Sequence, residues 1–327
     1  MTREILERLP ALSVLVVGDI CLDRWCTYDP SEAEPSRETG IPRVGVVSTT
    51  VTPGAGGTIA SNLVAMKVGR VAVLGAVGDD GFGYELRGAL TARGISTDHL
   101  ITIPAAQTFT YTKLINASSG EEDLPRVDFI TTTPLDAAAE RQILDKLQTT
   151  FDTFDVILVS DQAETSRGGV VTAALRDLLA DLAPNYPDKV VMADSRTRIG
   201  EFRSVILKPN RQEAEMACRK LFGAVDYRGL LRHAEAPFLF VTHGEDGVAL
   251  VTAEGEQWAP ARKVGKPVDI CGAGDSFSAG AATALAVTGS PLEAARFGNL
   301  VASITIMKKG TGTASPSEIL LNEDAGD

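Results

Sequence analysis

Short apolar segments with the length of buried strands alternate along this chain with longer segments whose apolar residues recur at helix spacing. The apolar segments are 13–17, 71–77, 155–159, 189–193, 205–207 and 238–242. The helical segments are 59–68, 83–93, 135–149, 170–182, 212–222 and 227–236. This alternation predicts an α/β fold with a doubly wound, mainly parallel sheet flanked by helices on both faces. Ligands of such folds bind beyond the carboxyl ends of the strands.

Three stretches depart from this alternation and predict a small antiparallel β lid. Residues 43–52, 108–115 and 124–130 are rich in β-branched and aromatic residues, as strands are. We expect the lid segments, approximately 20–52 and 107–131, to be inserted into a single domain that spans residues 1–327. Residues 248–252 and 257–260 are typical of a β-hairpin at the far edge of the main sheet.

Composition narrows the class of protein. The 327 residues, 44% of them hydrophobic, are enough for one large α/β domain with a substantial core. Because 43 acidic residues outnumber 31 basic ones, we expect no nucleic-acid partner and no membrane surface. No apolar run is long enough to span a bilayer, and the charged start of the sequence predicts no secretory leader. The four cysteines lack metal-binding spacing, which favours reduced thiols in the cytoplasm, with a Cys21–Cys26 disulfide as the minor alternative.

The segment 269–277 carries the clearest chemical signal. Gly272, Ala273 and Gly274 have little or no side chain, so an anion can approach their amides at the start of the helix that follows. Asp275 stands where a base would meet a hydroxyl that attacks this anion. The segment therefore favours phosphoryl transfer to an alcohol. An ordinary glycine-rich helix entry with an N-terminal acid is the alternative.

Two further segments follow predicted strands and could hold a nucleotide. Asn210 and Glu213 open a helix and could organise Mg²⁺ and phosphates, or they could simply form a capping box. Thr242, Gly244 and Gly247 could cradle phosphate with a hydroxyl and backbone amides, although most sequences of this kind are turns.

The predicted sugar side of the site begins near the first strand. Asp23 could accept hydrogen bonds from sugar hydroxyls, and the glycines within 54–57 would allow a ligand close to the backbone. Both features could instead belong to a solvated loop.

The order, spacing and strand context of these segments resemble the ribokinase-like (PfkB) carbohydrate kinases over nearly the whole chain. The resemblance implies the ribokinase-like fold and an ATP- and magnesium-dependent sugar kinase. It implies that Asp275 is the general base and that Gly272, Ala273 and Gly274 form the anion hole. The other residues that it assigns are Asn210 and Glu213 for magnesium and phosphates, Thr242, Gly244 and Gly247 for nucleotide phosphates, Asn299 for adenine, and Asp23, Gly56 and Gly57 for the sugar.

The same resemblance implies a potassium site. Its ligands would be Asp269 and the backbone carbonyls of Cys271, Thr305, Lys308 and Gly310. Family members often pair their lids, which together with the exposed β edges suggests a homodimer.

Within the family, the chain is most similar to the kinases of heptose 7-phosphate. The shared features lie at residues 18–25, 36–38, 112–114, 126–129 and 310–316. A phosphosugar needs cations, and the candidates are Lys113, Arg126, Arg196 and Arg198, each of which could equally be a solubilising surface charge.

The chain departs from the family in the sugar pocket. Thr58 stands where an asparagine is usual, and the segment 160–167 lacks the usual lysine. A kinase of another sugar or a nucleoside therefore stays open, as does a catalytically silent sensor of sugar or nucleotide.

Overall fold

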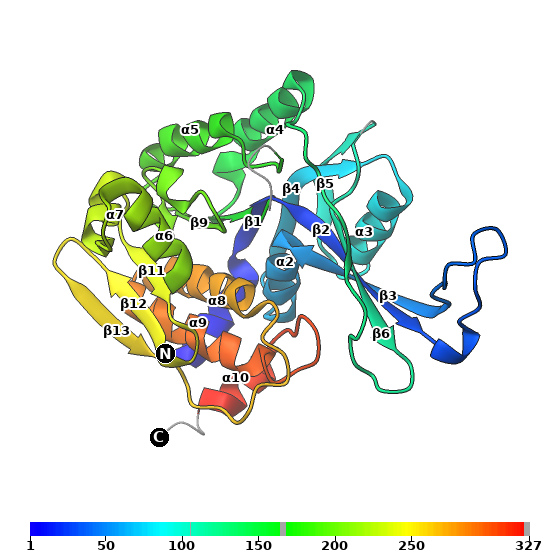
Figure 1. Ribbon diagram of the computed structural model, residues 1–327. Coiled ribbons are helices and arrows are strands. Elements are labelled where there is room, and N and C mark those ends of the chain that lie inside the picture. The colour runs from blue at the N-terminus through cyan, green and yellow to red at the C-terminus, as the bar shows by residue number, and fades with distance from the viewer. Residues whose placement is uncertain (105, 164–167, 324–327) are drawn as a thin grey trace.

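The computed structural model describes residues 1–104, 106–163 and 168–323. Its main sheet has nine strands in the order β13-β12-β11-β10-β9-β8-β1-β4-β5 (Figure 1). Strands β5 to β11 along this order are parallel, and the β11-β12-β13 edge is antiparallel. The strands are β1 (Ser13–Gly18), β4 (Arg70–Gly78), β5 (Ser96–Ile103), β8 (Val156–Asp161), β9 (Val190–Ser195), β10 (Ile206–Leu207), β11 (Leu239–Thr242), β12 (Gly247–Val251) and β13 (Glu256–Pro260).

Helices cover both faces of this sheet, and the central strand shows why. Along β1, Val14 and Val16 join one hydrophobic cluster, while Leu15 and Val17 join the other. The first cluster lies under α1 (Thr2–Arg8), α2 (Gly56–Ala65), α3 (Gly81–Thr91), α8 (Ala273–Thr288), α9 (Pro291–Thr305) and α10 (Pro316–Glu323). The second lies under α4 (Ala137–Thr150), α5 (Ala173–Leu182), α6 (Arg211–Phe222) and α7 (Tyr227–His233). Because successive side chains of a strand point to opposite faces, a continuous apolar run of this kind requires cover on both sides.

The lid is a separate four-stranded sheet that projects from the body (Figure 1). Its strands are β3 (Val46–Ala55), β2 (Ile20–Tyr28), β6 (Thr110–Asn116) and β7 (Val127–Phe129), in that order. The β2–β3 and β6–β7 pairs are antiparallel, but the central β2–β6 pair is parallel. Strands β2 and β6 follow β1 and β5, whose carboxyl ends lie at the same edge of the main sheet. Both therefore leave that edge in the same direction.

The predicted fold class is confirmed, as is the β lid, and the parallel β2–β6 pair refines its topology. Each predicted strand of the main sheet and the β12–β13 hairpin is present within a few residues of its expected bounds. Strand β5 was not predicted, because Asp98 and His99 interrupt its apolar pattern.

Helices α8 and α9 pack closely enough to fix the start of α8. A Cβ atom on Gly298 would lie 2.7 Å from the ring of Phe277, and one on Gly280 would lie 2.9 Å from Val301. Glycine at these two positions lets the helix axes approach. The first turn of α8 is thereby held beside the carboxyl ends of β9 and β10.

All four cysteines are free, so the minor alternative of a Cys21–Cys26 disulfide is not supported. Within the described ranges, no helix has both the length and the apolar character needed to cross a membrane.

Candidate active site

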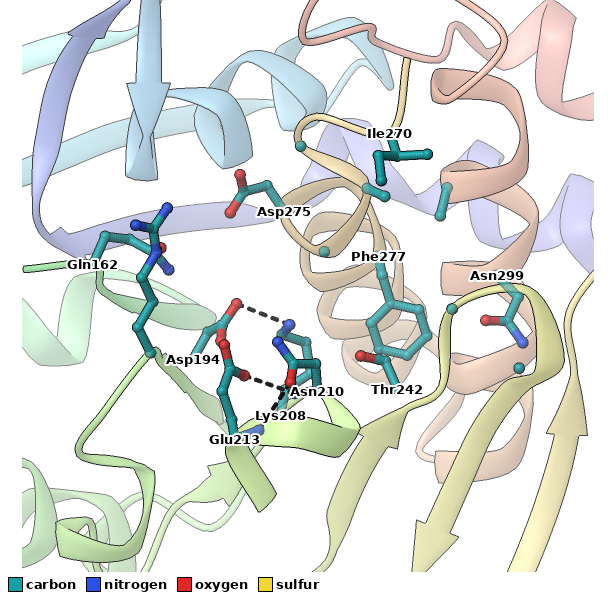
Figure 2. A pocket seen from close by; sticks show the side chains of 17 residues that line it. Gln162, Asp194, Lys208, Asn210, Glu213, Thr242, Ile270, Asp275, Phe277 and Asn299 are labelled. Atoms are coloured by element: carbon teal, nitrogen blue, oxygen red, sulfur yellow. Dashed lines mark hydrogen bonds and ion pairs between the residues drawn. The ribbon is translucent and has the colours of Figure 1, made fainter. Parts of the chain in front are cut away.

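A cavity of about 330 Å³ lies at the carboxyl end of the main sheet, between the starts of α6 and α8 and the β11–β12 turn (Figure 2). It brings together predicted residues from four separate segments of the sequence. These are Asn210, Glu213, Thr242, Gly244, Gly247, Gly272, Ala273, Gly274, Asp275 and Asn299. It also contains residues that the sequence did not single out for this site, namely Gln162, Asp194, Lys208, Ile270, Phe277 and Ala302.

The start of α8 has the geometry expected of an anion hole. Gly272 is the N-cap and adopts a left-handed conformation with φ 78°, which favours glycine. No side chain among the described residues caps this helix end. The first turn of a helix leaves backbone N–H groups without internal partners. These amides and the helix dipole can therefore serve an anionic ligand in the cavity.

Asp275 lies in this first turn with its side chain toward the cavity (Figure 2). Burial raises the pKa of its carboxyl to about 7, and the negative charge of Asp194 adds to the rise. The positive charges of Lys208 and Arg196 lower this pKa. A carboxylate that titrates near neutral pH suits a general base, because it can both hold and release a proton.

Lys208 and Asp194 form an ion pair at the floor of the cavity. The Nζ of Lys208 lies 2.8 Å from Oδ2 of Asp194, and the lysine side chain is 3% exposed. Asp194 lies near the end of β9, and Lys208 directly follows β10, which is the parallel neighbour of β9. The only signal in the sequence was that Lys208 and Asp194 stand at the ends of predicted strands. Their ion pair could not be predicted, because it depends on the order of the strands in the sheet.

Asn210 and Glu213 form a reciprocal capping box at the start of α6. The backbone N–H of Glu213 donates to Oδ1 of Asn210 at 2.9 Å, and that of Asn210 donates to Oε2 of Glu213 at 2.7 Å. The capping alternative is thus confirmed. It does not remove Glu213 from the site, because its carboxylate still lines the cavity. Burial, followed by the charge of Asp194, raises the pKa of Glu213.

These carboxylates fit a magnesium ion that is held partly by nucleotide phosphates. Within the described part of the chain, no group of three or more histidine, cysteine and acidic side chains forms a protein-only metal site. Mg²⁺ is commonly bound by one or two carboxylates together with substrate phosphates and water. Glu213 and Asp194 provide two hard oxygen ligands in one cavity, and their mutual repulsion would be relieved by a cation.

The turn between β11 and β12 borders the cavity and leaves open space beside Gly244. Gly244 has φ 61°, and a Cβ atom there would meet nothing within 4 Å. Gly247 has a packing role, because a Cβ atom there would lie 2.3 Å from the carbonyl oxygen of Ala259. Asn299 donates from Nδ2 to the carbonyl oxygens of Ala259 and Pro260, at 3.1 Å each. Its side-chain amide thus anchors the rim of the cavity.

The predicted sugar-binding residues lie on the lid side. Burial raises the pKa of Asp23 to about 6, and the positive charges of Lys113 and Arg126 lower it, so these cations lie near the carboxylate. Lys113 stacks its ammonium 4.4 Å from the ring centroid of Trp25. Arg126 pairs with Asp128 at 2.7 Å. The cations are therefore oriented by neighbours in the lid rather than free on the surface.

Gly56 and Gly57 have a structural reason to be glycine. A Cβ atom on Gly56 would lie 2.6 Å from Ile20, and one on Gly57 would lie 2.5 Å from Pro53. The two glycines let the start of α2 pack against the lid strands. Thr58 is buried beside them, and its hydroxyl donates to the carbonyl oxygen of Pro53 at 3.4 Å.

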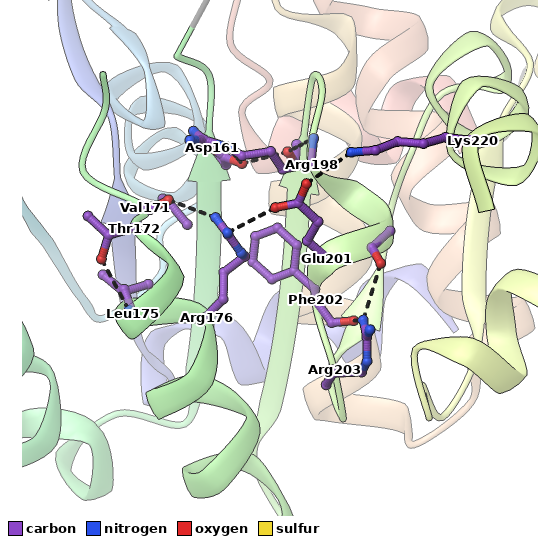
Figure 3. A network of polar contacts seen from close by, with 12 residues as sticks. Asp161, Val171, Thr172, Leu175, Arg176, Arg198, Glu201, Phe202, Arg203 and Lys220 are labelled. Carbon is purple, nitrogen blue, oxygen red and sulfur yellow. Dashed lines mark hydrogen bonds and ion pairs between the residues drawn. The ribbon is translucent and has the colours of Figure 1, made fainter. Parts of the chain in front are cut away.

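The two arginines proposed for a phosphosugar have different surroundings. Arg196 lines the cavity, and its Nε donates to Oε1 of Gln162 at 2.8 Å. Arg198 binds the buried carboxylate of Asp161 and belongs to a separate polar network (Figure 3). Arg198 is therefore a structural cation outside the cavity, because Asp161 would otherwise be a buried unpaired charge. In the segment 160–167, which differs from the family pattern, residues 164–167 lie outside the described residues.

The two halves of the predicted potassium site are adjacent. Oδ1 of Asp269 accepts from the amide of Cys271 at 2.9 Å, and Oδ2 accepts from the amide of Gly310 at 3.1 Å. The carbonyl oxygen of Thr305 accepts from the amide of Lys308 at 3.1 Å. The side chain of Lys308 points elsewhere and pairs with Glu318 at 2.6 Å.

Comparison with known proteins agrees with this geometry. The pfkB family of carbohydrate kinases matches residues 11–318. The chain belongs to this family. It is 30% identical to the bifunctional protein HldE of Pelobacter propionicus over 97% of its own length, and 30% identical to that of Trichlorobacter lovleyi over 98%. The chain spans 64% of the length of each of these relatives.

Solved structures of other kinases have a similar fold. Escherichia coli phosphofructokinase-2 in complex with potassium has a TM-score of 0.71 at 17% identity, covering 96% of this chain and 99% of its own. Thermotoga maritima ribokinase has a TM-score of 0.69 at 20% identity, with the same coverage of both chains. These similarities confirm the predicted ribokinase-like fold of the chain.

Proposed function

We propose that this pfkB-family chain transfers the γ-phosphoryl group of ATP to a hydroxyl of a sugar phosphate, with heptose 7-phosphate as the best-supported acceptor. The observation that carries the proposal is the position of Asp275. A carboxylate whose pKa is about 7 stands in the uncapped first turn of α8, in a cavity shared with Asn210, Glu213 and Thr242. The proton acceptor and the anion-binding amides thus belong to one site.

The roles of the residues follow from this arrangement. Asp275 takes the proton from the acceptor hydroxyl, whose oxygen forms the new bond to phosphorus as the bond to the ADP leaving oxygen breaks. The amides of Gly272, Ala273 and Gly274 neutralise charge on the transferring group. Glu213 and Asn210, together with Asp194, would hold a magnesium ion, which would neutralise charge on the phosphates of ATP.

Cations near Asp23 support a phosphorylated acceptor. Lys113 and Arg126 come from different lid strands or loops, and both act electrostatically on Asp23. Each cation also has a carboxylate partner in the lid, Glu122 at 3.9 Å from Lys113 and Asp128 at 2.7 Å from Arg126. A sugar with hydroxyls and a phosphate group would use Asp23 for the hydroxyls and these cations for the phosphate. The resemblance of residues 18–25, 36–38, 112–114, 126–129 and 310–316 to the kinases of heptose 7-phosphate supports this acceptor in particular.

A coupled ADP-release screen tests the substrate. It includes heptose 7-phosphate, unphosphorylated heptose, ribose, fructose 6-phosphate and adenosine. We expect the highest kcat/KM for heptose 7-phosphate, and we expect Lys113→Gln and Arg126→Gln to raise its KM without raising that of unphosphorylated heptose. A preference for adenosine would show that the acceptor is a nucleoside rather than a sugar phosphate. No turnover with any acceptor, together with intact ATP binding, would favour a sensor.

We also propose a monovalent-cation site at Asp269 with the carbonyl oxygens of Cys271, Thr305, Lys308 and Gly310. The two segments are already joined by the Asp269 hydrogen bonds to Cys271 and Gly310. A cation there would stiffen the loop that leads into the anion hole. Replacing potassium by tetramethylammonium at constant ionic strength is expected to lower kcat, and equal rates in both salts would exclude the site.

The lid supports a proposal of homodimer formation. Strand β3 is an edge of the lid sheet, and its beginning exposes Val46 at 46% and Val47 at 58%. Exposed apolar edge strands favour pairing with another chain. Light scattering is expected to give twice the chain mass for the wild type and for the control Leu321→Asp on α10, but the monomer mass for Val47→Asp. A monomeric wild type would reject the dimer.

A further inference from the structure

We propose that Lys208 is a further catalytic residue, whose ammonium contacts the γ-phosphoryl group of ATP across Gly274 and stabilises the charge on it during transfer. Asp194 is the positioning residue that holds this ammonium. The proposal rests on the proposed function, because it concerns the same phosphoryl group.

The first observation is where the ammonium lies. Lys208 follows the two-residue strand β10, and its backbone N–H donates to the carbonyl oxygen of Ala193 at 2.9 Å. A Cβ atom on Gly274 would lie 3.4 Å from the Nζ of Lys208, the one contact within 4 Å that the described residues make there from outside the helix turn itself. The ammonium therefore lies close to the backbone of the anion hole, on the opposite side of the cavity (Figure 2).

The second observation is that few of the hydrogen-bond donors of this ammonium have a protein partner. A lysine ammonium has three N–H donors. In the described part of the chain it has one partner, Oδ2 of Asp194 at 2.8 Å, although the side chain is only 3% exposed. A buried charge that keeps unused donors is costly unless a ligand completes it. Since the side chain lines the cavity beside the anion hole, a phosphate oxygen is the acceptor that fits.

The third observation is the charge around Lys208. Asp194, Glu213 and Asp275 approach it from the end of β9, the start of α6 and the start of α8, and all three favour its charged form. Arg196 is the other cation that acts on Asp275. A purely structural ion pair would need one carboxylate, whereas here the ammonium stands among three that surround the predicted phosphate position.

The chemistry is electrostatic and leaves Lys208 unchanged. The bond between the γ-phosphorus and the β–γ bridging oxygen breaks, the acceptor oxygen bonds to phosphorus, and its proton goes to Asp275. Lys208 keeps its proton throughout. A lysine serves phosphate as a compact point charge, and its contribution grows in a site that excludes water.

Nucleotide discrimination tests the contact with the γ-phosphoryl group. In the full-length chain with Mg²⁺, Lys208→Gln is expected to weaken binding of the non-hydrolysable analogue AMP-PNP about 10-fold, while ADP binding changes less than about 2-fold. A merely structural lysine would affect both nucleotides alike. The matched control is Lys220→Gln on α6, whose side chain is 70% exposed and pairs with Glu201. It should bind both nucleotides as the wild type does.

Kinetics provide the second readout. Lys208→Gln is expected to lower kcat about 100- to 1,000-fold, the range for loss of one preorganised charge-stabilising group. The acidic limb of the rate profile should move to higher pH, because Asp275 keeps the two acids that raise its pKa, Asp194 and Asp23, and retains only Arg196 of its two cations. A kcat within about 3-fold of the wild type, with unchanged AMP-PNP and ADP affinities, would overturn the proposal.

A double variant that removes both charges serves as the control for misfolding. If Lys208→Gln alone does not fold, Asp194→Asn/Lys208→Gln buries no unpaired charge, and it is compared with Asp194→Asn, which keeps the ammonium. Loss of the AMP-PNP preference in the double variant, with a smaller loss in Asp194→Asn, supports the proposal, and a wild-type preference in the double variant refutes it. Because nucleotide binding needs no acceptor, a wild type that prefers AMP-PNP but phosphorylates no sugar would reject the proposed function while leaving this contact intact.

Discussion

The carboxylate of Asp23 lies directly over the backbone of Gly54, so that a Cβ atom on Gly54 would come 2.6 Å from its Oδ2. Both residues belong to the β2–β3 pair of the lid. The absence of a side chain at residue 54 therefore fixes where this carboxylate can stand. The position of Asp23, the acid proposed to bind the sugar, therefore depends on glycine at residue 54.

Gly54→Ala is predicted to displace Asp23 and to raise the KM for the sugar at least 10-fold. The ATP affinity should stay within about 2-fold, because the nucleotide residues lie in other segments. Steady-state kinetics with each substrate varied in turn measure both values. Gly88→Ala is the matched control, since a Cβ atom there meets nothing within 4 Å and alanine favours the interior of α3. An unchanged sugar KM in Gly54→Ala would remove Asp23 from the sugar site.

The rate should depend on pH through Asp275. Its pKa of about 7 lies above the ordinary value of 3.8, so the basic form becomes dominant only as pH rises past neutrality. We expect kcat to increase from pH 5 to pH 8 with a midpoint near 7. Nucleotide binding measured in the same buffers separates this effect from binding. A flat profile between pH 5 and 8 would contradict a general base with this pKa.

The same shift predicts a cost in stability. Because the pKa of Asp275 is higher in the folded chain, the folded state binds more protons than the unfolded state between about pH 4 and 7, and stability falls as pH rises through that window. Asp275→Asn is therefore expected to unfold at a higher temperature than the wild type at pH 8, by about 1–4 kcal/mol in free energy. At pH 4 the difference should largely vanish. The exposed Asp188→Asn, a control, should change neither melting curve.

Glu213 has two roles that substitution can separate. Glu213→Gln keeps an oxygen acceptor for the Asn210 amide but loses the charge, so the magnesium concentration for half-maximal rate should rise about 10-fold with little change in Tm. Glu213→Ala should lose about 1 kcal/mol of stability as well, because it removes the capping acceptor. Equal magnesium dependence in the wild type and Glu213→Gln would confine Glu213 to the capping box.

Much of the fold could be predicted because its signals are local. The apolar runs of β1 and β8 and the periodicity of the helices each lie within a few consecutive residues, and the alternation of the two specifies a parallel sheet. Strand β5 escaped prediction because its polar residues mask its apolar face. The parallel β2–β6 pairing could not be predicted from composition, because it depends on where β1 and β5 end in space.

The site likewise combines residues that are adjacent in the sequence, which could be predicted, with residues that only the fold brings together. Asp275 with its glycines, and Asn210 with Glu213, were predicted because each set is contiguous in the sequence. The Lys208–Asp194 pair was not, because 13 intervening residues separate its members, and only the β9–β10 pairing brings them within 2.8 Å. Arg198 had the right charge at the right strand end, but burial of Asp161 gave it a structural partner instead.

The central claim is that Asp275 deprotonates the acceptor beside amides that hold the transferring phosphoryl group. The most direct measurement is the single-turnover rate of Asp275→Asn with the preferred sugar, alongside its ATP affinity. We predict a rate lowered by two to four orders of magnitude, about the range for a general base, with ATP affinity close to that of the wild type. A rate equal to that of the wild type would contradict the account.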